Sequence, residues 1–402
     1  MTRKTVVIGM DGVPLRLIEE LTDSGDMPNC AHLRKEGYLS SMHSAVPEVS
    51  NVNWSSIVTG ANPGEHGIYG FTELIPGTHT VCFPDRRALK APPFWSDNSK
   101  RYVLLNIPAM YPAPEVNGVF VSGFVAPDLD KAVKPMDELE YLRSIDYEVD
   151  VDSSIAHKSH RLFLERLFET LEKREKAYRY YWTRKWDVFM LVFTGSDRLE
   201  HFLMDAYADE EHEYHEEFIR YFREIDRIVG DIYGSMDEGS RLVMLSDHGM
   251  EPIKINVNVN ALLEQNGLLE LGGHPEKRYN NIVDEGTSAF ALDPGRIYLR
   301  DKDVAREVIS LFEGLKYEGE DVIGRINLRD DVYHGPEIER APDIVLTPNS
   351  GYNIKGGVKY EDVFEKNIFK GKHTASDAFL YCNEKCIPRS PTVEDVRDII
   401  EK

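Results

Sequence analysis

The stretch Arg241-Leu-Val-Met-Leu-Ser-Asp247-His248-Gly249 joins a short apolar run to an aspartate and a histidine. Two other runs also end in aspartate: Thr5-Val-Val-Ile-Gly-Met-Asp11 and Asp187-Val-Phe-Met-Leu-Val-Phe-Thr-Gly-Ser-Asp197. Continuous runs rich in Val, Ile, Leu and Phe are typical of parallel strands buried on both faces. Ligands of such open sheets bind beyond the carboxyl ends of the strands, so the three aspartates are predicted to meet at one edge.

Three carboxylates at one sheet edge would repel one another strongly unless a cation lay among them. His201 stands four residues after Asp197, and a helix that begins at Asp197 would place both side chains on one face, where they can bind one ion. Asp247 and His248 are adjacent and have to splay in a turn, where we expect Gly249 to allow an unusual backbone.

His373, in the loop Gly371-Lys-His-Thr-Ala-Ser, is a further candidate ligand. Aspartate and neutral imidazole together favour Zn²⁺ or a similar first-row metal over Ca²⁺ or Mg²⁺. Taken singly, an aspartate after a strand commonly caps the next helix, and a lone histidine is usually an ordinary hydrogen-bonded residue. The same ordinary interpretation is preferred for five other histidines: His157, His160, His212, His215 and His274.

The segments between these runs predict an α/β fold, with a mostly parallel central sheet and helices on both faces. Helical patterns cover residues 14–23, 28–36, 158–184, 209–234 and 302–314, and further strand-like runs cover residues 101–107, 296–300 and 341–347. We interpret residues 1–402 as a single catalytic domain in which 75–157 and 253–365 contain cap or insertion segments. The acidic stretch 125–157 is expected to be irregular.

The 402 residues are 42% hydrophobic and carry a net charge of −22, which argues against a groove for a nucleic-acid polymer. A small phosphorylated substrate stays possible because bound metal ions can dominate the local field. The start Met1-Thr-Arg-Lys leads directly into a strand, and no run approaches 18 apolar residues, so neither a signal peptide nor a membrane span is expected. We expect a cytoplasmic protein, with a homodimer left open, whose four cysteines are free thiols: Cys30, Cys82, Cys382 and Cys386.

The order of these motifs resembles the alkaline phosphatase superfamily. Asp11-Gly12, Ile57-Val-Thr-Gly60 with Pro63-Gly-Glu-His-Gly-Ile68, Asp197-x-x-x-His201, Ser246-Asp-His-Gly-Met250 and a late Lys372-His373 follow one another as in its type I phosphodiesterase/nucleotide pyrophosphatase branch. The resemblance runs from Asp11 to His373 and is weakest over 75–185 and 253–365. It implies an alkaline phosphatase-like fold and a metal-dependent hydrolase of small organic phosphate esters.

Carried over onto this sequence, the resemblance implies two divalent metal ions, with Zn²⁺ preferred and Mn²⁺ as the alternative. One ion would be held by Asp197, His201 and His373. The other would be held by a second group with the nucleophile as an additional ligand: Asp11, Asp247, His248 and Ser50.

The nucleophile in this branch is usually a threonine three residues before an asparagine, a spacing that selects Ser50 and Asn53 here. Asn53 matches a position that binds a non-bridging phosphoryl oxygen. Ser55, Ser56 and Thr59 are nearby hydroxyls, but they fall in a predicted helix that ends at Gly60, where they would point away or cap it.

A serine hydroxyl is a poor nucleophile at neutral pH and needs a base or a metal to activate it. No histidine is next to Ser50 in the sequence, so metal coordination is the predicted activator. Two divalent ions about 4 Å apart can stabilise both the attacking and the leaving oxygen of an in-line displacement. The predicted course therefore has a phosphoserine intermediate that water hydrolyses.

Other members of the superfamily are alternatives. A sulfatase would have x-Pro-x-Arg after its nucleophile, whereas Ser50 is followed by Asn-Val-Asn-Trp. A phosphomonoesterase or a cofactor-independent phosphoglycerate mutase-like phosphotransferase stays open; we prefer diesters because Asn53 replaces an additional arginine. A mutase has to retain glycerate with basic groups. Five residues are candidates for this role, and we otherwise interpret them as exposed charges: Arg86, Arg87, Lys90, Arg198 and Lys372.

A non-enzymatic metal-binding protein is the third class of function, and it would not need a serine near the metals. Three aromatic residues could pack the organic part of a substrate, although core packing explains them equally well: Trp54, Tyr69 and Phe71.

Overall fold

The computed structural model describes residues 3–75, 78, 80–273, 278–283, 285–366 and 368–402. His274 lies outside the described residues. The chain forms two compact units: residues 1–61, 85–250 and 369–402 make the first, and residues 62–84 and 251–368 make the second. The assignment of 1–402 to one catalytic domain with insertions stays our interpretation.

The first unit is built around a mixed sheet. Its strands are β1 (Thr5–Met10), β2 (Tyr38–Met42), β5 (Tyr102–Ile107), β6 (Gly118–Ser122), β7 (Val133–Lys134), β8 (Val188–Phe193), β9 (Arg241–Leu245) and β21 (Ala378–Cys382). Within the described residues they lie in the order β2-β21-β9-β1-β8-β5-β6-β7. The run from β9 to β6 is parallel, and β21, β2 and β7 are antiparallel at the edges. The predicted mostly parallel α/β sheet is confirmed.

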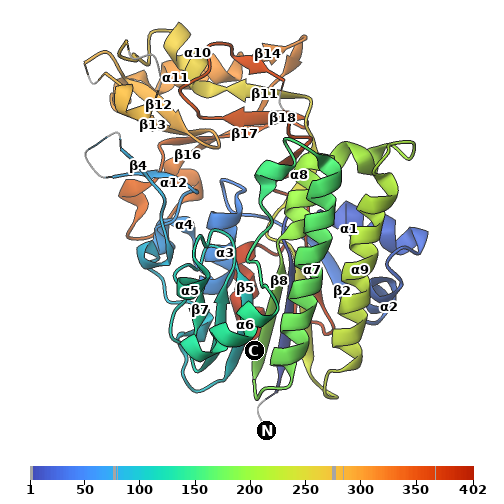
Figure 1. Cartoon of the computed structure of the whole chain (residues 1–402). Coiled ribbons are helices and arrows are strands. Elements are labelled where there is room, and N and C mark those ends of the chain that lie inside the picture. Colours follow the sequence, from blue (N-terminus) through green and yellow to red (C-terminus); the bar gives the residue numbers. More distant parts are fainter. Residues whose placement is uncertain (1–2, 76–77, 79, 274–277, 284, 367) are drawn as a thin grey trace. The chain divides into compact units, whose positions relative to one another are not determined.

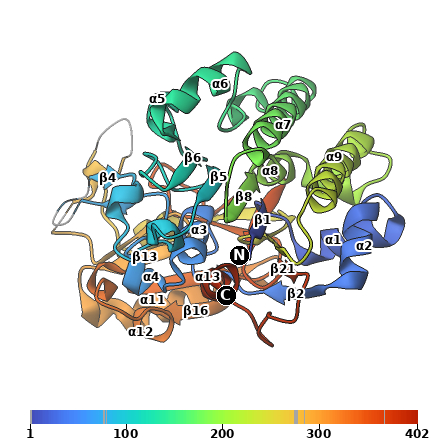
Figure 2. The same ribbon diagram turned by 90° about the horizontal axis from the view of Figure 1, so that it is seen from below.

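Helices cover both faces of this sheet. They are α1 (Leu15–Ser24), α2 (Pro28–Glu36), α3 (Ser50–Thr59), α5 (Leu129–Ala132), α6 (Leu139–Ser144), α7 (His160–Trp182), α8 (Gly195–Ala208), α9 (His215–Gly234) and α13 (Val396–Glu401). Val6, Ile8 and Met10 point into a core shared with α7, α8 and α9. The opposite face of β1 meets α3, because a side chain on Gly9 would lie 2.6 Å from Trp54. Figure 2 shows α7, α8 and α9 on one side of β1 and β8, and α3 and α13 on the other.

Most predicted elements of the first unit are present, with ends shifted by one or two residues. Figure 1 shows the two longest of them, α7 and α9, side by side. The prediction that a helix begins at residue 209 was wrong, since α9 starts at His215. Residues before it form turns in which the Asp209 carboxylate accepts from the Glu211 N–H at 3.0 Å. An aspartate offers the backbone this local alternative to a helix.

The stretch 125–157 is less irregular than expected. It contains α5, α6 and β7, and β7 pairs antiparallel with β6. Val133 of β7 is fully buried, which explains the pairing. Elements of two to six residues are too short to show a periodic pattern in the sequence.

The second unit has a core of its own around Ile297, Val308, Phe312 and Ile344. Its described sheets include β12-β13-β17-β16 and β18-β11-β19, so that the predicted strands 296–300 and 341–347 correspond to β13 and β17 and the predicted helix 302–314 to α11. The strands and helices are β3 (Glu73–Leu74), β4 (Val81–Cys82), β11 (Ile255–Asn258), β12 (Ala289–Leu292), β13 (Arg296–Leu299), β14 (Lys316–Tyr317), β15 (Glu320–Asp321), β16 (Ile323–Leu328), β17 (Ile344–Pro348), β18 (Tyr352–Lys355), β19 (Phe364–Glu365), α4 (Pro63–His66), α10 (Val259–Gln265), α11 (Ala305–Glu313) and α12 (Arg329–Val332).

Among the described helices, none is both long and apolar enough to cross a membrane. The four cysteines are free thiols, and the sulfur atoms of Cys382 and Cys386 lie 2.9 Å apart. The cytoplasmic location and the homodimer stay predictions.

Candidate metal centre and active site

Three neighbouring parallel strands deliver the three aspartates to one place. In the sheet β1 lies between β9 and β8, with Gly9 opposite Leu245 and Met10 opposite Phe193. The strands end level with one another, and the residues that follow them carry Asp11, Asp197 and Asp247, all buried. The parallel pairing therefore places the carboxylates together, as the strand-end pattern predicts.

Gly12 allows this close approach. Its φ of +78° lies in the left-handed region, and a Cβ there would lie 3.0 Å from the Cβ of Asp197. Its N–H donates to Asp247 Oδ1 at 3.2 Å. A side chain at this position would therefore strain the backbone and push the strand ends apart.

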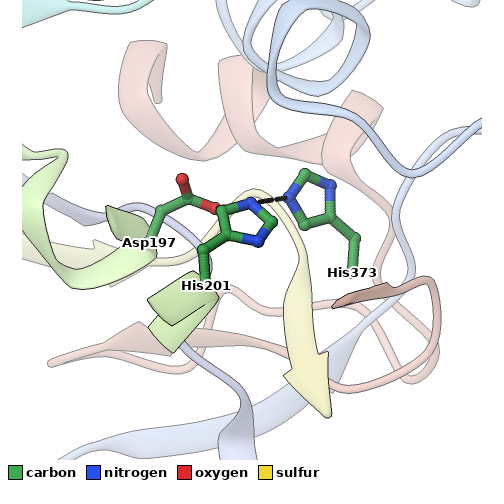
Figure 3. Close-up of side chains that lie close together, drawn as sticks. All are labelled: Asp197, His201 and His373. Carbon is green, nitrogen blue, oxygen red and sulfur yellow. Dashed lines mark hydrogen bonds and ion pairs between the residues drawn. The ribbon is translucent and has the colours of Figure 1, made fainter. Parts of the chain in front are cut away.

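The first candidate metal group consists of Asp197, His201 and His373, whose ligand atoms lie within 4.8 Å of one another. Asp197 and His201 stand on one face of α8, with Oδ1 and Nε2 3.4 Å apart. His373 comes from β20 (Gly371–Thr374), and its Nε2 lies 3.3 Å from Asp197 Oδ1 and 3.0 Å from His201 Nε2. Figure 3 shows the two rings and the carboxylate turned toward one another.

The second candidate group consists of Asp11, Asp247 and His248. Asp247 and His248 lie in a bend between β9 and β10 (Gly249–Pro252), and His248 Nε2 is 3.4 Å from Asp247 Oδ2 and 3.8 Å from Asp11 Oδ1. The expected unusual backbone at Gly249 is absent, since its φ is not positive. A glycine fits there because a Cβ would lie 2.0 Å from Asp377 Oδ1.

The three histidines of these groups are oriented in the same way. Each has its Nδ1 at 2.8 to 3.0 Å from a backbone carbonyl oxygen: His201 from Gly371, His248 from Gly249 and His373 from Glu48. A carbonyl only accepts, so Nδ1 is the donor in each of these contacts and Nε2 is left to face the site. Burial lowers the pKa of His201, and it lowers that of His373 to about 3, so both rings are neutral at pH 7.

The aspartates are oriented by donors outside the two groups. Each has one oxygen in such a hydrogen bond of 2.9 to 3.2 Å: Asp11 Oδ2 from Trp54 Nε1, Asp197 Oδ2 from Arg198 Nη1 and Asp247 Oδ1 from the Gly12 N–H. Within the described part of the chain, Asp197 Oδ1 and Asp247 Oδ2 are buried without a hydrogen-bond partner. Carboxylate oxygens and imidazole nitrogens thus converge, an arrangement that a cation would stabilise.

The pKa values of the three aspartates also favour a cation in the centre. Burial and repulsion from the neighbouring carboxylates raise the pKa of Asp11 well above its usual value, and burial is the main cause that raises the pKa of Asp247 to about 8. Burial alone would also raise the pKa of Asp197, but its neighbours, the Arg198 guanidinium among them, hold it well below its usual range. Cations between these carboxylates would remove the repulsion.

Ser50 is the first residue of α3 and lies beside the second group. Its Oγ is 3.3 Å from Asp11 Oδ1 and 3.1 Å from His248 Nε2. Asn53, one turn later, is fully buried and accepts from the Ala45 N–H through Oδ1 at 2.8 Å. Its Nδ2 has no hydrogen-bond partner among the described residues. A hydroxyl beside the second group and an amide donor that is unused within the described residues therefore lie one helical turn apart.

The other hydroxyls of this segment are used within the helix. The Ser55 hydroxyl donates to the Asn51 carbonyl at 2.7 Å, and the Thr59 hydroxyl donates to the Ser55 carbonyl at 2.6 Å. The helix ends before Gly60, whose φ is +63°. The expectation that these two hydroxyls are directed away from the site agrees with these contacts.

The model of the type I phosphodiesterase / nucleotide pyrophosphatase family matches residues 5–376 of the chain. The chain belongs to this family. Membership makes it an α/β hydrolase that acts on phosphoester bonds and confirms the resemblance found in the sequence.

Solved structures of other proteins show the same fold. Phosphonoacetate hydrolase from Sinorhizobium meliloti 1021, in complex with phosphonoacetate, has 18% sequence identity and a TM-score of 0.69, over 99% of this chain and 95% of that chain. Murine ectonucleotide pyrophosphatase / phosphodiesterase 5 has 12% identity and a TM-score of 0.57, over 99% of this chain and 94% of that one. The human protein of the same name has 12% identity and a TM-score of 0.58, over 99% and 93%.

Sequence reasoning missed the contacts of two residues beside the candidate centre. Trp54 was interpreted as packing a substrate or the core, yet its indole N–H is a hydrogen-bond donor to Asp11. The interpretation of Arg198 as an exposed charge was wrong: its side chain is 14% exposed and pairs with Asp197. Lys372 is also buried, whereas the side chain of Arg87 is 75% exposed as expected. The only signal for either missed residue was its position beside a candidate site residue in the sequence.

Proposed function

We propose that this chain is a two-metal hydrolase of small organic phosphate esters, phosphodiesters in preference to monoesters, with Ser50 as its nucleophile. The observation that carries the proposal is the position of Ser50 Oγ, within 3.3 Å of Asp11 and 3.1 Å of His248, ligand candidates of one of the two metal groups. A non-enzymatic metal protein would not require a hydroxyl at that point.

The residues present suit two divalent cations. One would be held by Asp197, His201 and His373, and the other by Asp11, Asp247 and His248 together with Ser50. The three aspartates and three imidazoles are a donor set typical of Zn²⁺, with Mn²⁺ as the alternative. When bound, such a pair of cations supplies stabilisation of negative charge on the attacking and leaving oxygens.

The chain's own groups then have distinct tasks. The Ser50 hydroxyl donates to Asp11 Oδ1, which orients its remaining lone pairs. Ser50 Oγ forms a bond to phosphorus as the bond from phosphorus to the leaving oxygen breaks. The Ser50 proton, which faces Asp11 Oδ1, ends on the departing alcohol, and the product is a phosphate ester of Ser50 that keeps the second substituent of a diester. Water then cleaves the bond between phosphorus and Oγ, which restores Ser50 and releases the phosphate product.

Asn53 and α3 stabilise the phosphoryl group. The unpartnered Nδ2 of Asn53 can donate to a non-bridging oxygen, and the positive end of the α3 dipole lies at Ser50. Asn53 is neutral, whereas an arginine would favour the additional charge of a monoester. This is the support for diesters.

A cavity of about 400 Å³ borders Arg198 and offers room for an organic substituent. Residues of two segments, 124–129 and 147–153, line it, and many of them are apolar. A mostly apolar cavity of this size suits a small ligand better than a polymer. Together with the net charge of −22, it supports a small phosphate ester as the substrate.

A substrate panel tests the proposal. The purified protein, loaded with Zn²⁺ or Mn²⁺, is assayed on bis-p-nitrophenyl phosphate, p-nitrophenyl phosphate, 3-phosphoglycerate and phosphonoacetate; the last is the ligand of one solved relative. We expect the highest kcat/KM on the diester. A preference for the monoester, or conversion of 3-phosphoglycerate to its isomer, would replace the diesterase assignment by the corresponding alternative.

Two variants test the mechanism. Ser50→Ala removes the nucleophile and Asp247→Ala removes a ligand, so both are expected to abolish turnover, while Ser50→Ala is expected to retain most metal binding. Rapid quenching of the wild type with a ³²P-labelled diester should give a ³²P-labelled phosphate ester at Ser50. Turnover of Ser50→Ala at the wild-type rate would refute the proposed nucleophile.

A further inference from the structure

Arg198 joins the first metal group to a segment that lies outside it. Its Nη1 donates to Asp197 Oδ2 at 2.9 Å, and its Nε donates to Asp150 Oδ2 at the same distance. The guanidinium carbon lies 4.1 Å from the centre of the Phe124 ring. Two edges of one planar group therefore contact two different carboxylates while an aromatic ring covers its face.

This pairing is protected from water. The side chains of Arg198 and Asp150 are 14% and 15% exposed. Burial strengthens the hydrogen bonds of such a pair, and it makes the loss of one partner costly because the other is left buried and charged. The contacts of Arg198 are thus more than a surface ion pair.

Asp150 is itself held in place. The Thr194 hydroxyl lies 3.4 Å from its Oδ1. The segment that carries it is tied to α7, because Glu148 pairs with Lys173 at 2.7 Å and with Arg166 at 3.0 Å. Asp150 therefore offers Arg198 a fixed partner.

The result is an unequal use of the two oxygens of Asp197. Oδ2 is occupied by Arg198, and Oδ1 faces His201 and His373 at 3.4 and 3.3 Å. Without Arg198 the carboxylate could rotate and present either oxygen or both. Replacement of a group that orients a ligand in this manner typically lowers metal affinity or activity by about 10- to 100-fold.

We propose that Asp150 and Arg198 form a positioning pair that fixes the Asp197 carboxylate with Oδ1 toward His201 and His373. The inference rests on the proposed function insofar as it needs a metal in that group. Arg198 is a positioning residue here, since it acts through Asp197. Asp150 acts one step further out, through Arg198.

Zn²⁺ binding to the metal-free protein, measured by competition with a chromophoric chelator and by calorimetry, tests the pair. Arg198→Gln is expected to weaken one of two binding sites by about 10- to 100-fold and to leave the other unchanged. Asp150→Asn is expected to weaken the same site by a smaller factor. Since Asp150 acts through Arg198, the double variant should bind no more weakly than Arg198→Gln alone.

Arg198→Lys replaces Arg198→Gln in this binding test if the glutamine variant fails to fold. It keeps the charge but replaces the planar fork by a single ammonium, so we expect weakened binding at the same site. Arg161→Gln is the matched control: it breaks an exposed ion pair to Glu165 on α7 and touches neither Asp197 nor the segment that carries Asp150. It should bind Zn²⁺ like the wild type.

Wild-type affinity in Arg198→Gln or Arg198→Lys would overturn the inference. Equal losses in Arg161→Gln would also overturn it. So would a double variant whose loss of affinity is the product of the two single-variant losses. A wild-type protein that binds no Zn²⁺ and hydrolyses no ester would instead contradict the proposed function. The two failures are therefore distinguishable.

Discussion

Asn53 shows how one buried amide can be prepared for a substrate. An amide side chain can be turned end for end, but here the Ala45 N–H, which can only donate, lies 2.8 Å from one end. That end has to be the oxygen, so Nδ2 is the free donor. Since it lies one turn after Ser50 in α3, it suits the oxygen of a phosphoryl group attached to Ser50.

Replacement of this amide should slow the reaction. Asn53→Ala is expected to lower kcat/KM for bis-p-nitrophenyl phosphate by about 10²- to 10³-fold, the usual effect of losing one donor to a developing oxyanion. Asn53→Asp should cost more, because it replaces a donor by a negative charge. Ser55→Ala is the matched control, since that hydroxyl is used inside the helix. An Asn53→Ala enzyme with wild-type kcat/KM would exclude Asn53 from phosphoryl binding.

The sequence indicates residues that belong to a spacing pattern. It does not indicate residues whose role depends only on their contacts in the folded chain. Asp197 and His201 were predicted because a spacing of four residues implies one helix face. Trp54 and Arg198 have no such pattern: their bonds to Asp11 and Asp197 depend on how α3 and α8 pack against the strand ends. Only three-dimensional packing identifies them.

At the scale of elements, the turn after β1 determines whether the strand ends can meet. Gly12 combines a φ of +78° with a Cβ position 3.0 Å from Asp197. Gly12→Ala should therefore lower the free energy of unfolding by about 1–3 kcal/mol and weaken Zn²⁺ binding, because it strains the backbone and displaces Asp11 from Asp197. Chemical denaturation and the chelator competition measure the two effects.

Gly239→Ala separates the effect of backbone strain from the effect of crowding against Asp197. Its φ is +80°, but no atom lies within 4 Å of the Cβ position, so it has the backbone strain without the crowding. It should lower stability to a smaller degree and leave metal binding unchanged. If Gly12→Ala binds Zn²⁺ as well as Gly239→Ala does, close approach of the strand ends is not what the glycine provides.

Elements with strong periodicity were predictable, and the pairing partners of the edge strands were not. Runs such as Val188–Phe193 and the long helix of residues 160–182 differ clearly from their surroundings. By contrast, β2 is mostly polar or half-buried and is a strand because Tyr38 pairs with Cys382, more than 300 residues later. Such distant pairing determines the edges of the sheet and the place of His373, and local sequence does not encode it.

At the scale of the whole molecule, the chain enters the second unit twice, through residues 62–84 and 251–368. His66 lies in the first of these passages, at the end of α4, and is fully buried. Burial lowers its pKa from 6.5 to about 3, so the ring stays neutral in the folded protein at pH values where it is protonated in the unfolded chain. The unfolded state therefore binds more protons between these values, and stability has to rise with pH.

The contribution of the neutral, buried His66 ring to the free energy of unfolding is fully present above pH 6.5, and it is lost as the pH falls toward 3. Between pH 7 and pH 5 a shift of this size removes about 2 kcal/mol from the free energy of unfolding. Urea denaturation at pH 7, 6 and 5 should show that His66→Gln loses less stability over this range than the wild type, whatever its stability at pH 7. His334→Gln is the matched control within the same unit, because that side chain is 70% exposed. If His66→Gln loses as much stability between pH 7 and pH 5 as the wild type does, burial does not keep His66 neutral.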